Sequence, residues 1–412
     1  MNSWSRSGGR LAAGVAGALV GAVAVLSLQG RHAPPEPAPK VRLGLTSNDD
    51  AKRSALDLRK SDGLKGTILL AWTPGELPAG SERIVERTPG VIDATTVLSG
   101  LDWIESSRAA DGTPIDSPPR GYAIPFEIAI IEPKEYAAFV PASERTAVNE
   151  ITSGEAVMAA TEANGLRGAS EGLHIDLGER SVRVASVVSD VATNGYEALM
   201  RGPAPATWSQ TNRFVLMHIK RASARRAVER RLEETLEPGG VLRLRAEGEA
   251  PFLRYGDAVM PQLLIKANFG EFAARPLPDG RIEIHPAWVK ANIRSAVLPV
   301  LGDVGRVTCH RALLPQLRAA LKDVAAQGLA YTIDPADYGG CFSPRFIDRD
   351  PGGRLSHHSW GIALDINARA NAFGTKPDQE PQLVSALQAR GFVWGGDWLI
   401  PDGMHFEWVE FP

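Results

Sequence analysis

Two short segments near the end of the chain constrain its fold more than any other feature. Apolar residues alternate with small or polar residues over 361–367, and again over 405–408. Because successive side chains of a β-strand point to opposite faces, each segment is predicted to be a half-buried strand with one apolar face. Asp365 lies on the other face of the first strand, and His405 and Glu407 lie on the corresponding face of the second.

Placed side by side, these strands would bring together His358, Asp365 and His405. His358 lies seven residues before Asp365, at the entry of the first strand. Two imidazoles and one carboxylate suit Zn²⁺, because they take three tetrahedral corners and leave the fourth for a water that ionises near neutral pH. Asp402, three residues before His405 in a turn, is near enough to accept that water's proton. The alternative is that both histidines are ordinary core or turn residues.

The same residues closely resemble the zinc D,D-peptidase family, which contains VanY-type D-alanyl-D-alanine carboxypeptidases and L-alanyl-D-glutamate endopeptidases. The family signature S-x-H-x-x-G-x-A-x-D is matched by Ser356, His358, Gly361, Ala363 and Asp365. The closing D-x-x-H-F-E is matched by Asp402, His405, Phe406 and Glu407. Both motifs have the family's order and internal spacing, and the resemblance covers roughly residues 300–412.

The resemblance implies zinc ligands at His358, Asp365 and His405 and a catalytic base at Asp402. Family members also have an arginine upstream of the first ligand, where this chain has Arg345. A guanidinium there could hold the substrate carboxylate or the developing oxyanion. Family members with glutamate in place of Asp402 include dipeptidases, so this aspartate disfavours the free D-Ala-D-Ala dipeptide as substrate.

We therefore expect a zinc-dependent metallopeptidase. It would hydrolyse peptide bonds of peptidoglycan stem peptides by metal-activated water, in the manner of a D-Ala-D-Ala carboxypeptidase. One alternative is a peptidoglycan endopeptidase that cuts the L-Ala-D-Glu bond or a cross-link. The other is a non-enzymatic wall-binding protein whose zinc is structural.

Three further polar residues of this part of the chain are assigned supporting roles. Glu407 is expected either to hydrogen-bond a ligand imidazole or to be a plain surface carboxylate. His357 is adjacent to a predicted ligand, but its side chain is expected to point elsewhere, without a metal role. His310 precedes a predicted helix and is expected to be structural.

Cys309 and Cys341 bracket a predicted helix–strand unit. An apolar stripe predicts an amphipathic helix over 312–327, and a strand is expected near 329–333. In an oxidising compartment the two cysteines can form a disulfide, worth roughly 3–4 kcal/mol on the chain-entropy account. The alternative is two free buried thiols.

The N-terminal segment is predicted to target the chain to a membrane. Residues 11–28 carry no charge and follow Arg6 and Arg10, and 18 residues at about 1.5 Å each span roughly 27 Å. We expect a single-pass anchor with residues 1–10 in the cytoplasm, and a cleaved signal peptide, which would make the protein secreted, is the alternative. The Pro-rich linker 29–50 then places the catalytic domain outside the cytoplasm.

The rest of the chain is predicted to be α+β. The length of 412 residues suggests two or three domains. A formal net charge of −3 argues against nucleic acid as a partner, and two cysteines exclude a Cys-rich zinc module. Residues 62–297 form an extracytoplasmic α+β region of unknown role, which could position the peptidase, bind wall glycan or contact an unknown protein partner. Residues 300–412 form the small α+β zinc D,D-peptidase-like domain, with an antiparallel sheet.

Within the middle region several elements are predicted individually. Residues 173–177 and 181–188 flank a turn and predict a hairpin, and 213–219 predicts another strand. A helix capped by Ser223 is expected to follow. The basic residues of that helix are interleaved with glutamates, so they are interpreted as a solvated face rather than a site for an anionic partner.

Overall fold

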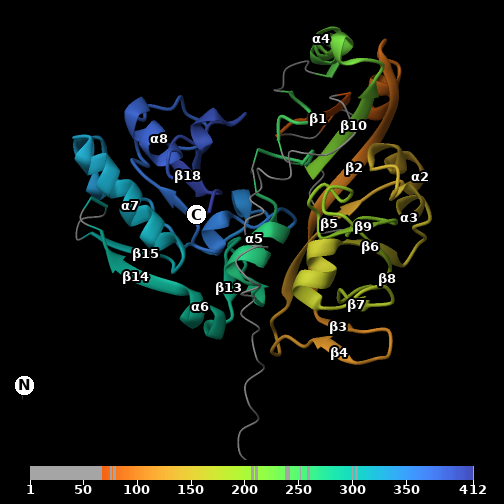
Figure 1. Cartoon of the computed structure of the whole chain (residues 1–412), viewed down its shortest axis with the longest axis horizontal. Coiled ribbons are helices and arrows are strands. Elements are labelled where there is room, and N and C mark those ends of the chain that lie inside the picture. Colours follow the sequence, from red (N-terminus) through yellow and green to blue (C-terminus); the bar gives the residue numbers. More distant parts are fainter. Residues whose placement is uncertain are drawn as a thin grey trace, which may run out of the picture. The chain divides into compact units, whose positions relative to one another are not determined.

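The computed structural model describes residues 67–74, 77, 80–205, 208, 212–236, 242–250, 252–257, 260–298, 300–301 and 305–411. These residues form a mixed α+β structure (Figure 1), as the sequence predicts. The predicted cytoplasmic segment 1–10, anchor or signal segment 11–28 and linker 29–50 all lie outside the described residues and stay predictions. In the part of the chain that is described, no helix is both long and apolar enough to cross a membrane.

The largest sheet is formed by the middle region and has eleven strands among the described residues. In spatial order they are β11 (Arg243–Ala246), β1 (Ile68–Trp72), β10 (Arg213–Ile219), β2 (Val91–Ile104), β5 (Ile124–Ile130), β9 (Ala198–Met200), β6 (Glu155–Ala159), β8 (Ser181–Val188), β7 (His174–Asp176), β3 (Ser106–Arg108) and β4 (Pro114–Asp116). Neighbours are antiparallel except for the pairs β5–β9 and β6–β8. The predicted β7–β8 hairpin and the strand β10 are confirmed.

Helix α4 (Arg225–Leu236) buries one face against this sheet through Val228, Leu232 and Leu236. It begins after the 3-10 turn Ala222–Ala224, so the predicted capping role of Ser223 is wrong, because that residue lies inside the turn. Among its described residues this region also contains α1 (Ser81–Glu86), α2 (Pro133–Tyr136), α3 (Arg145–Asn149), the 3-10 turn Ala137–Phe139 and the π-helix Thr161–Arg167.

The basic residues of α4 behave as a solvated face. Arg226, Arg230 and Arg231 are exposed. Arg225 forms ion pairs with Glu229 at 2.5 Å and with Glu249 at 2.6 Å. Exposure and pairing with glutamates are what a solvated face requires, and the interpretation of this cluster as such a face stays a prediction.

A buried group of charged side chains joins helix α5 (Gln262–Phe269) to the π-helix and the large sheet. Lys266 of α5 is buried, and its Nζ lies 3.0 Å from Glu197 Oε2 and 2.9 Å from Glu271 Oε1. Arg167 binds Glu162 at 2.8 Å and Glu271 at 2.6 Å. Buried charges of this kind are tolerated because they are paired, and removing one partner is strongly destabilising. The network therefore fixes α5 against the sheet.

The C-terminal part follows α5 and forms small antiparallel sheets, as expected. Its elements are β12 (Ala274–Pro276), β13 (Ile282–Ile284), α6 (Pro286–Asn292), β14 (Ile293–Val297), β15 (Arg306–His310), α7 (Leu313–Ala326), β16 (Ala363–Asp365), α8 (Pro381–Gln388), β17 (Phe392–Trp394) and β18 (His405–Trp408). The strands pair as β12–β13, β14–β15 and β16–β18–β17. One hydrophobic cluster supports all of these elements; it contains buried residues from Met260 to Val409 and also Leu101 of β2.

The predicted amphipathic helix is present as α7, which buries Leu313, Leu317, Leu321 and Val324. The strand expected near 329–333 is wrong. Ala330–Thr332 form a 3-10 turn, in which Thr332 donates to the carbonyl of Leu329 through both its backbone N–H, at 3.0 Å, and its hydroxyl, at 2.6 Å. Leu329 and Ile333 are buried while the residues between them are not. Two buried residues four positions apart fit one turn of a helix as well as one face of a strand, so the sequence pattern alone does not separate the two.

Candidate metal centre

Strand pairing places two of the predicted ligands opposite each other. Strands β16 and β18 are antiparallel, and their register puts Asp365 opposite His405. His358 comes from the 3-10 turn His357–Ser359, and its backbone N–H donates to the hydroxyl of Ser356 at 3.4 Å. Gly361, between this turn and β16, has a φ of +69°, and a Cβ there would lie 2.8 Å from the backbone nitrogen of His310. Only glycine fits this connection, which explains its place in the motif.

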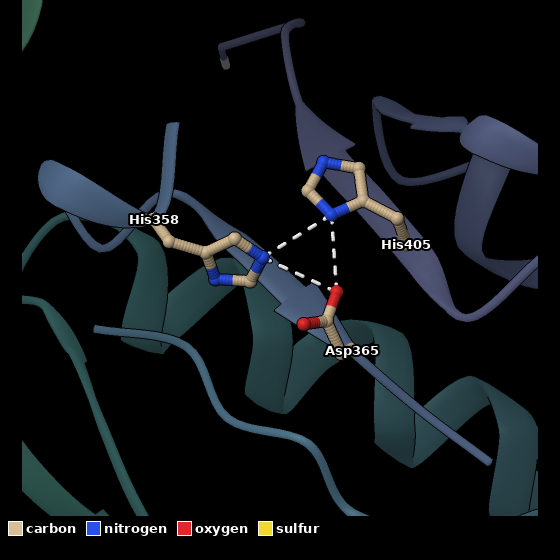
Figure 2. Close-up of side chains that lie close together, drawn as sticks. All are labelled: His358, Asp365 and His405. Atoms are coloured by element: carbon tan, nitrogen blue, oxygen red, sulfur yellow. Dashed lines mark hydrogen bonds and ion pairs between the residues drawn. The ribbon is translucent and has the colours of Figure 1, made fainter. Parts of the chain in front are cut away.

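Figure 2 shows the two imidazoles and the carboxylate pointing toward one another. His358 Nε2 lies 3.2 Å from both Asp365 Oδ1 and His405 Nδ1, and His405 Nδ1 lies 3.0 Å from Asp365 Oδ1. Ligands about 2.0–2.1 Å from a tetrahedral zinc are about 3.3 Å apart. The spacing of the three atoms therefore fits a single ion of this kind.

The outer nitrogen of each imidazole has its own acceptor. His358 Nδ1 lies 2.8 Å from the carbonyl oxygen of Cys341, and His405 Nε2 lies 3.1 Å from Glu407 Oε1. Donation to these oxygens turns the inner nitrogens, His358 Nε2 and His405 Nδ1, toward Asp365. His358 Nε2, His405 Nδ1 and Asp365 Oδ1 then all present lone pairs to one point. This arrangement of three electron-pair donors is stable only with a positive charge among them. The residues present fit a divalent metal.

The electrostatics of the site lead to the same conclusion. Burial opposes ionisation of Asp365, but His358 and His405 outweigh it and hold the pKa of this carboxyl well below its usual range. Burial by itself lowers the pKa of His405, yet hydrogen bonds to Asp365 and Glu407 raise it to about 10. Burial lowers the pKa of His358. The site thus favours one added positive charge, which a proton on His405 or a metal ion can supply.

Asp402 lies in the turn that leads into β18. Its backbone N–H donates to Gly395 at 2.9 Å, and its carbonyl accepts from the N–H of His405 at 3.1 Å. A Cβ at Gly395 would lie 2.8 Å from the carbonyl oxygen of Asp402, so the turn can close only on a glycine. Burial raises the pKa of Asp402 to about 6, and its Oδ1 is buried without a hydrogen-bond partner among the described residues. This carboxylate is free to accept a proton.

A cleft of about 580 Å³ opens onto the site, within the range of small-molecule and peptide pockets. Arg345, Asp402 and His405 all line it. Arg345 is half-buried, and its Nη1 donates to the carbonyl of Ser343 at 3.2 Å. The predicted base Asp402 and the predicted arginine Arg345 therefore share the cleft with His405, one of the three clustered side chains.

The structure also shows a residue that the sequence did not assign to the site. The Nδ1 of His357 lies 2.9 Å from Glu407 Oε1, the same oxygen that faces His405 Nε2. Strand alternation correctly places Glu407 on the face of His405, and the first of its two expected roles is the one observed. The expectation from the sequence is that His357 points elsewhere. The direction of its side chain could not be predicted, because side chains on a 3-10 turn do not follow strand alternation.

Residues 349–408 match the family model of D-alanyl-D-alanine carboxypeptidase. The match contains both motifs and confirms the resemblance of this C-terminal segment to the peptidase family. No curated protein matches the chain.

Two solved structures show limited similarity to the chain. One is the periplasmic region of MacB from Actinobacillus actinomycetemcomitans, at 9% identity, covering 44% of this chain and 89% of that chain with a TM-score of 0.30. The other is the extracellular domain of the noncanonic ABC-type transporter YknZ from Gram-positive bacteria, at 10% identity, covering 43% of this chain and 98% of that chain with a TM-score of 0.29. These scores are too low to support any statement about this chain.

Proposed function

We propose that this chain is a zinc metallopeptidase that hydrolyses peptide bonds of peptidoglycan stem peptides and removes terminal D-alanine. The observation that carries the proposal is the convergence of three ligand atoms within 3.2 Å, with both outer imidazole nitrogens held by acceptors. The family match over residues 349–408 supports the class of reaction and substrate.

In this proposal His358, Asp365 and His405 hold the zinc. When bound, zinc lowers the pKa of a coordinated water and polarises a carbonyl. Asp402, with its raised pKa and unpartnered oxygen, accepts the proton of the attacking water. Arg345 binds the terminal carboxylate of the substrate or the charge that develops on the carbonyl oxygen.

The proposed location agrees with the proposed substrate. An anchor at residues 11–28 and a Pro-rich linker at 29–50 would hold the peptidase outside the cytoplasm, where peptidoglycan lies. Cys309 and Cys341 form a disulfide, and such bonds persist in oxidising compartments. Both features support an extracytoplasmic, membrane-attached enzyme.

The size of the cleft supports a second candidate, an endopeptidase. Its lining extends from the metal site to Trp72 and Asn212 of the middle region, which leaves room for a chain longer than a terminal dipeptide. The two activities differ in whether the cleft accepts peptide on both sides of the cleaved bond.

The test is product analysis by mass spectrometry. The full chain, purified in detergent with one equivalent of zinc, is incubated with purified wall fragments, with and without a chelator. A carboxypeptidase releases free alanine, and an endopeptidase releases two peptide fragments. If neither product forms while zinc remains bound, the enzymatic proposal is wrong and a wall-binding protein with structural zinc is the better description.

A further inference from the structure

The cleft beside the metal site has a wall that belongs to the middle region. Trp72 of β1, Asn212 and Tyr255 are buried residues that line it, together with the less buried Asp257. Asp257 Oδ2 also accepts the backbone N–H of Leu399 at 2.8 Å. The region of unknown role thus contacts the segment that precedes Asp402 and shapes the space that a substrate would enter.

Hydrogen bonds from the middle region and from the turn between β12 and β13 hold the loop 345–354, which carries several of the cleft residues. Asn212 Nδ2 donates to the carbonyl of Gly352 at 3.2 Å, and Phe346 N–H donates to the carbonyl of Gly280 at 3.0 Å. Within the loop, Asp348 and Arg349 are consecutive non-glycine residues with φ of 53° and 59°. Such left-handed residues are strained, and they persist where the surrounding structure holds them, most often at functional sites.

Arg354 lies at the end of this loop, against the middle-region wall. Its guanidinium carbon is 5.7 Å from the centre of the Tyr255 ring. The Nη2 of Arg354 lies close to the backbone of Gly256, whose φ of +83° favours glycine. The side chain is half-buried and lines the cleft. Its position is therefore fixed by packing.

The guanidinium of Arg354 has no ion pair or hydrogen bond with any residue that the structure describes. Neighbouring arginines differ in this respect, since Arg245 pairs with Asp257 at 3.0 Å and buried Arg254 pairs with Glu127. Charges withdrawn from water are usually paired. A fixed, half-buried guanidinium that faces a cleft without a protein partner is suited to an anion that comes from outside.

We propose that Arg354 binds a second carboxylate of the peptide substrate, one carried by an internal residue, while Arg345 serves the carboxylate or oxyanion at the metal site. This inference rests on the proposed function and specifies its substrate class as an acidic peptide with a free internal carboxylate. The middle region then contributes to substrate specificity, because its Tyr255 ring packs against the guanidinium of Arg354.

The experiment compares two synthetic stem peptides that differ only in whether the internal carboxylate is free or amidated. The kcat and KM of each are measured with the full-length wild type, Arg354→Gln and, as the matched control, Arg318→Gln, which lies exposed on α7 outside the cleft. A charge-assisted pair predicts a wild-type preference for the free acid of about 10- to 100-fold, mainly in KM. Arg354→Gln should abolish that preference and leave the amidated peptide unaffected, whereas Arg318→Gln should change neither.

The inference is overturned if the wild type does not distinguish the peptides, or if Arg354→Gln keeps the preference while its zinc content and thermal unfolding match the wild type. It is also overturned if Arg349→Gln removes the preference and Arg354→Gln does not. If neither peptide is cleaved, the proposed enzymatic function fails separately. In that case the binding of the two peptides is measured by calorimetry. The inference stands only if Arg354→Gln weakens binding of the free-acid peptide and not of the amidated peptide.

Discussion

Asp365 and His405 lie directly opposite each other on the antiparallel strands β16 and β18, with Asp365 Oδ1 3.0 Å from His405 Nδ1. The neighbouring pair in the register is Leu364 with Phe406, and both of these side chains are fully buried. A slip of one residue would exchange the apolar and polar faces of a strand. Burial of the apolar pair therefore fixes the register that brings the two ionisable side chains together.

The charge of His405 predicts that zinc uptake releases a proton. Its pKa is raised to about 10 against burial, so metal-free His405 is protonated at pH 7.5, and a metal at Nδ1 must displace that proton. Calorimetry in buffers of different ionisation enthalpy should show that, at pH 7.5, the wild type releases about one proton more per zinc than His405→Gln does. This difference should disappear above about pH 10, and equal proton release from the two proteins at pH 7.5 would contradict the assignment.

Glu407 is predicted to hold the imidazole of His405 rather than to bind metal itself. Its Oε1 lies 3.1 Å from His405 Nε2. Replacing such a supporting group typically reduces metal affinity 10- to 100-fold. Glu407→Gln should show a loss of this size in competition with a chelating dye. Glu410→Gln, at an exposed position three residues further on, should bind zinc like the wild type. Equal affinities in the two variants would show that Glu407 is not needed to orient the imidazole.

Local alternation was sufficient to predict the core of the site. The polar faces of 361–367 and 405–408 are correctly predicted, and the pairing of these strands brings Asp365 and His405 together as expected. His358 could be placed only at the entry of a strand, and its orientation depends on the carbonyl of Cys341, seventeen residues earlier. No local pattern in the sequence indicates that contact.

The contribution of the middle region could not be predicted, for a related reason. Tyr255 and Asn212 reach the cleft through pairing and packing between segments that are distant in sequence. The charges around Lys266 likewise come from separate segments and become a network only in the fold. Secondary structure follows from short-range periodicity, whereas these contacts depend on the tertiary arrangement.

The disulfide is predicted to stabilise both the fold and the site. Cys309 and Cys341 are separated by 32 residues, and closing a loop of that size is worth about 3–4 kcal/mol of unfolding free energy. The carbonyl of Cys341 also accepts from His358, so Cys309→Ala/Cys341→Ala should weaken zinc binding as well. Denaturant unfolding of this variant and of the reduced wild type should agree with each other, and both should fall below the oxidised protein. Equal stability of all three would count against the bond.

Asp402 is predicted to be needed for turnover and not for metal binding. Loss of a general base typically reduces kcat 10²- to 10⁴-fold. Asp402→Asn should show a decrease of this size at unchanged zinc content. Asp397→Asn is the matched control, since Asp397 is exposed in the same segment and does not line the cleft. Full activity in Asp402→Asn would remove this residue from the mechanism.

The pH dependence of the wild type offers a separate test of Asp402. Burial raises its pKa to about 6, above the value of about 3.9 for an exposed aspartate. A base acts only when ionised, so kcat/KM should fall as the pH decreases through the pKa. The charge of a neighbouring zinc ion draws that pKa down, which places the midpoint at or below pH 6. The residual activity of Asp402→Asn should lack this acid limb. If kcat/KM of Asp402→Asn falls at low pH as it does in the wild type, the decrease comes from the titration of another group.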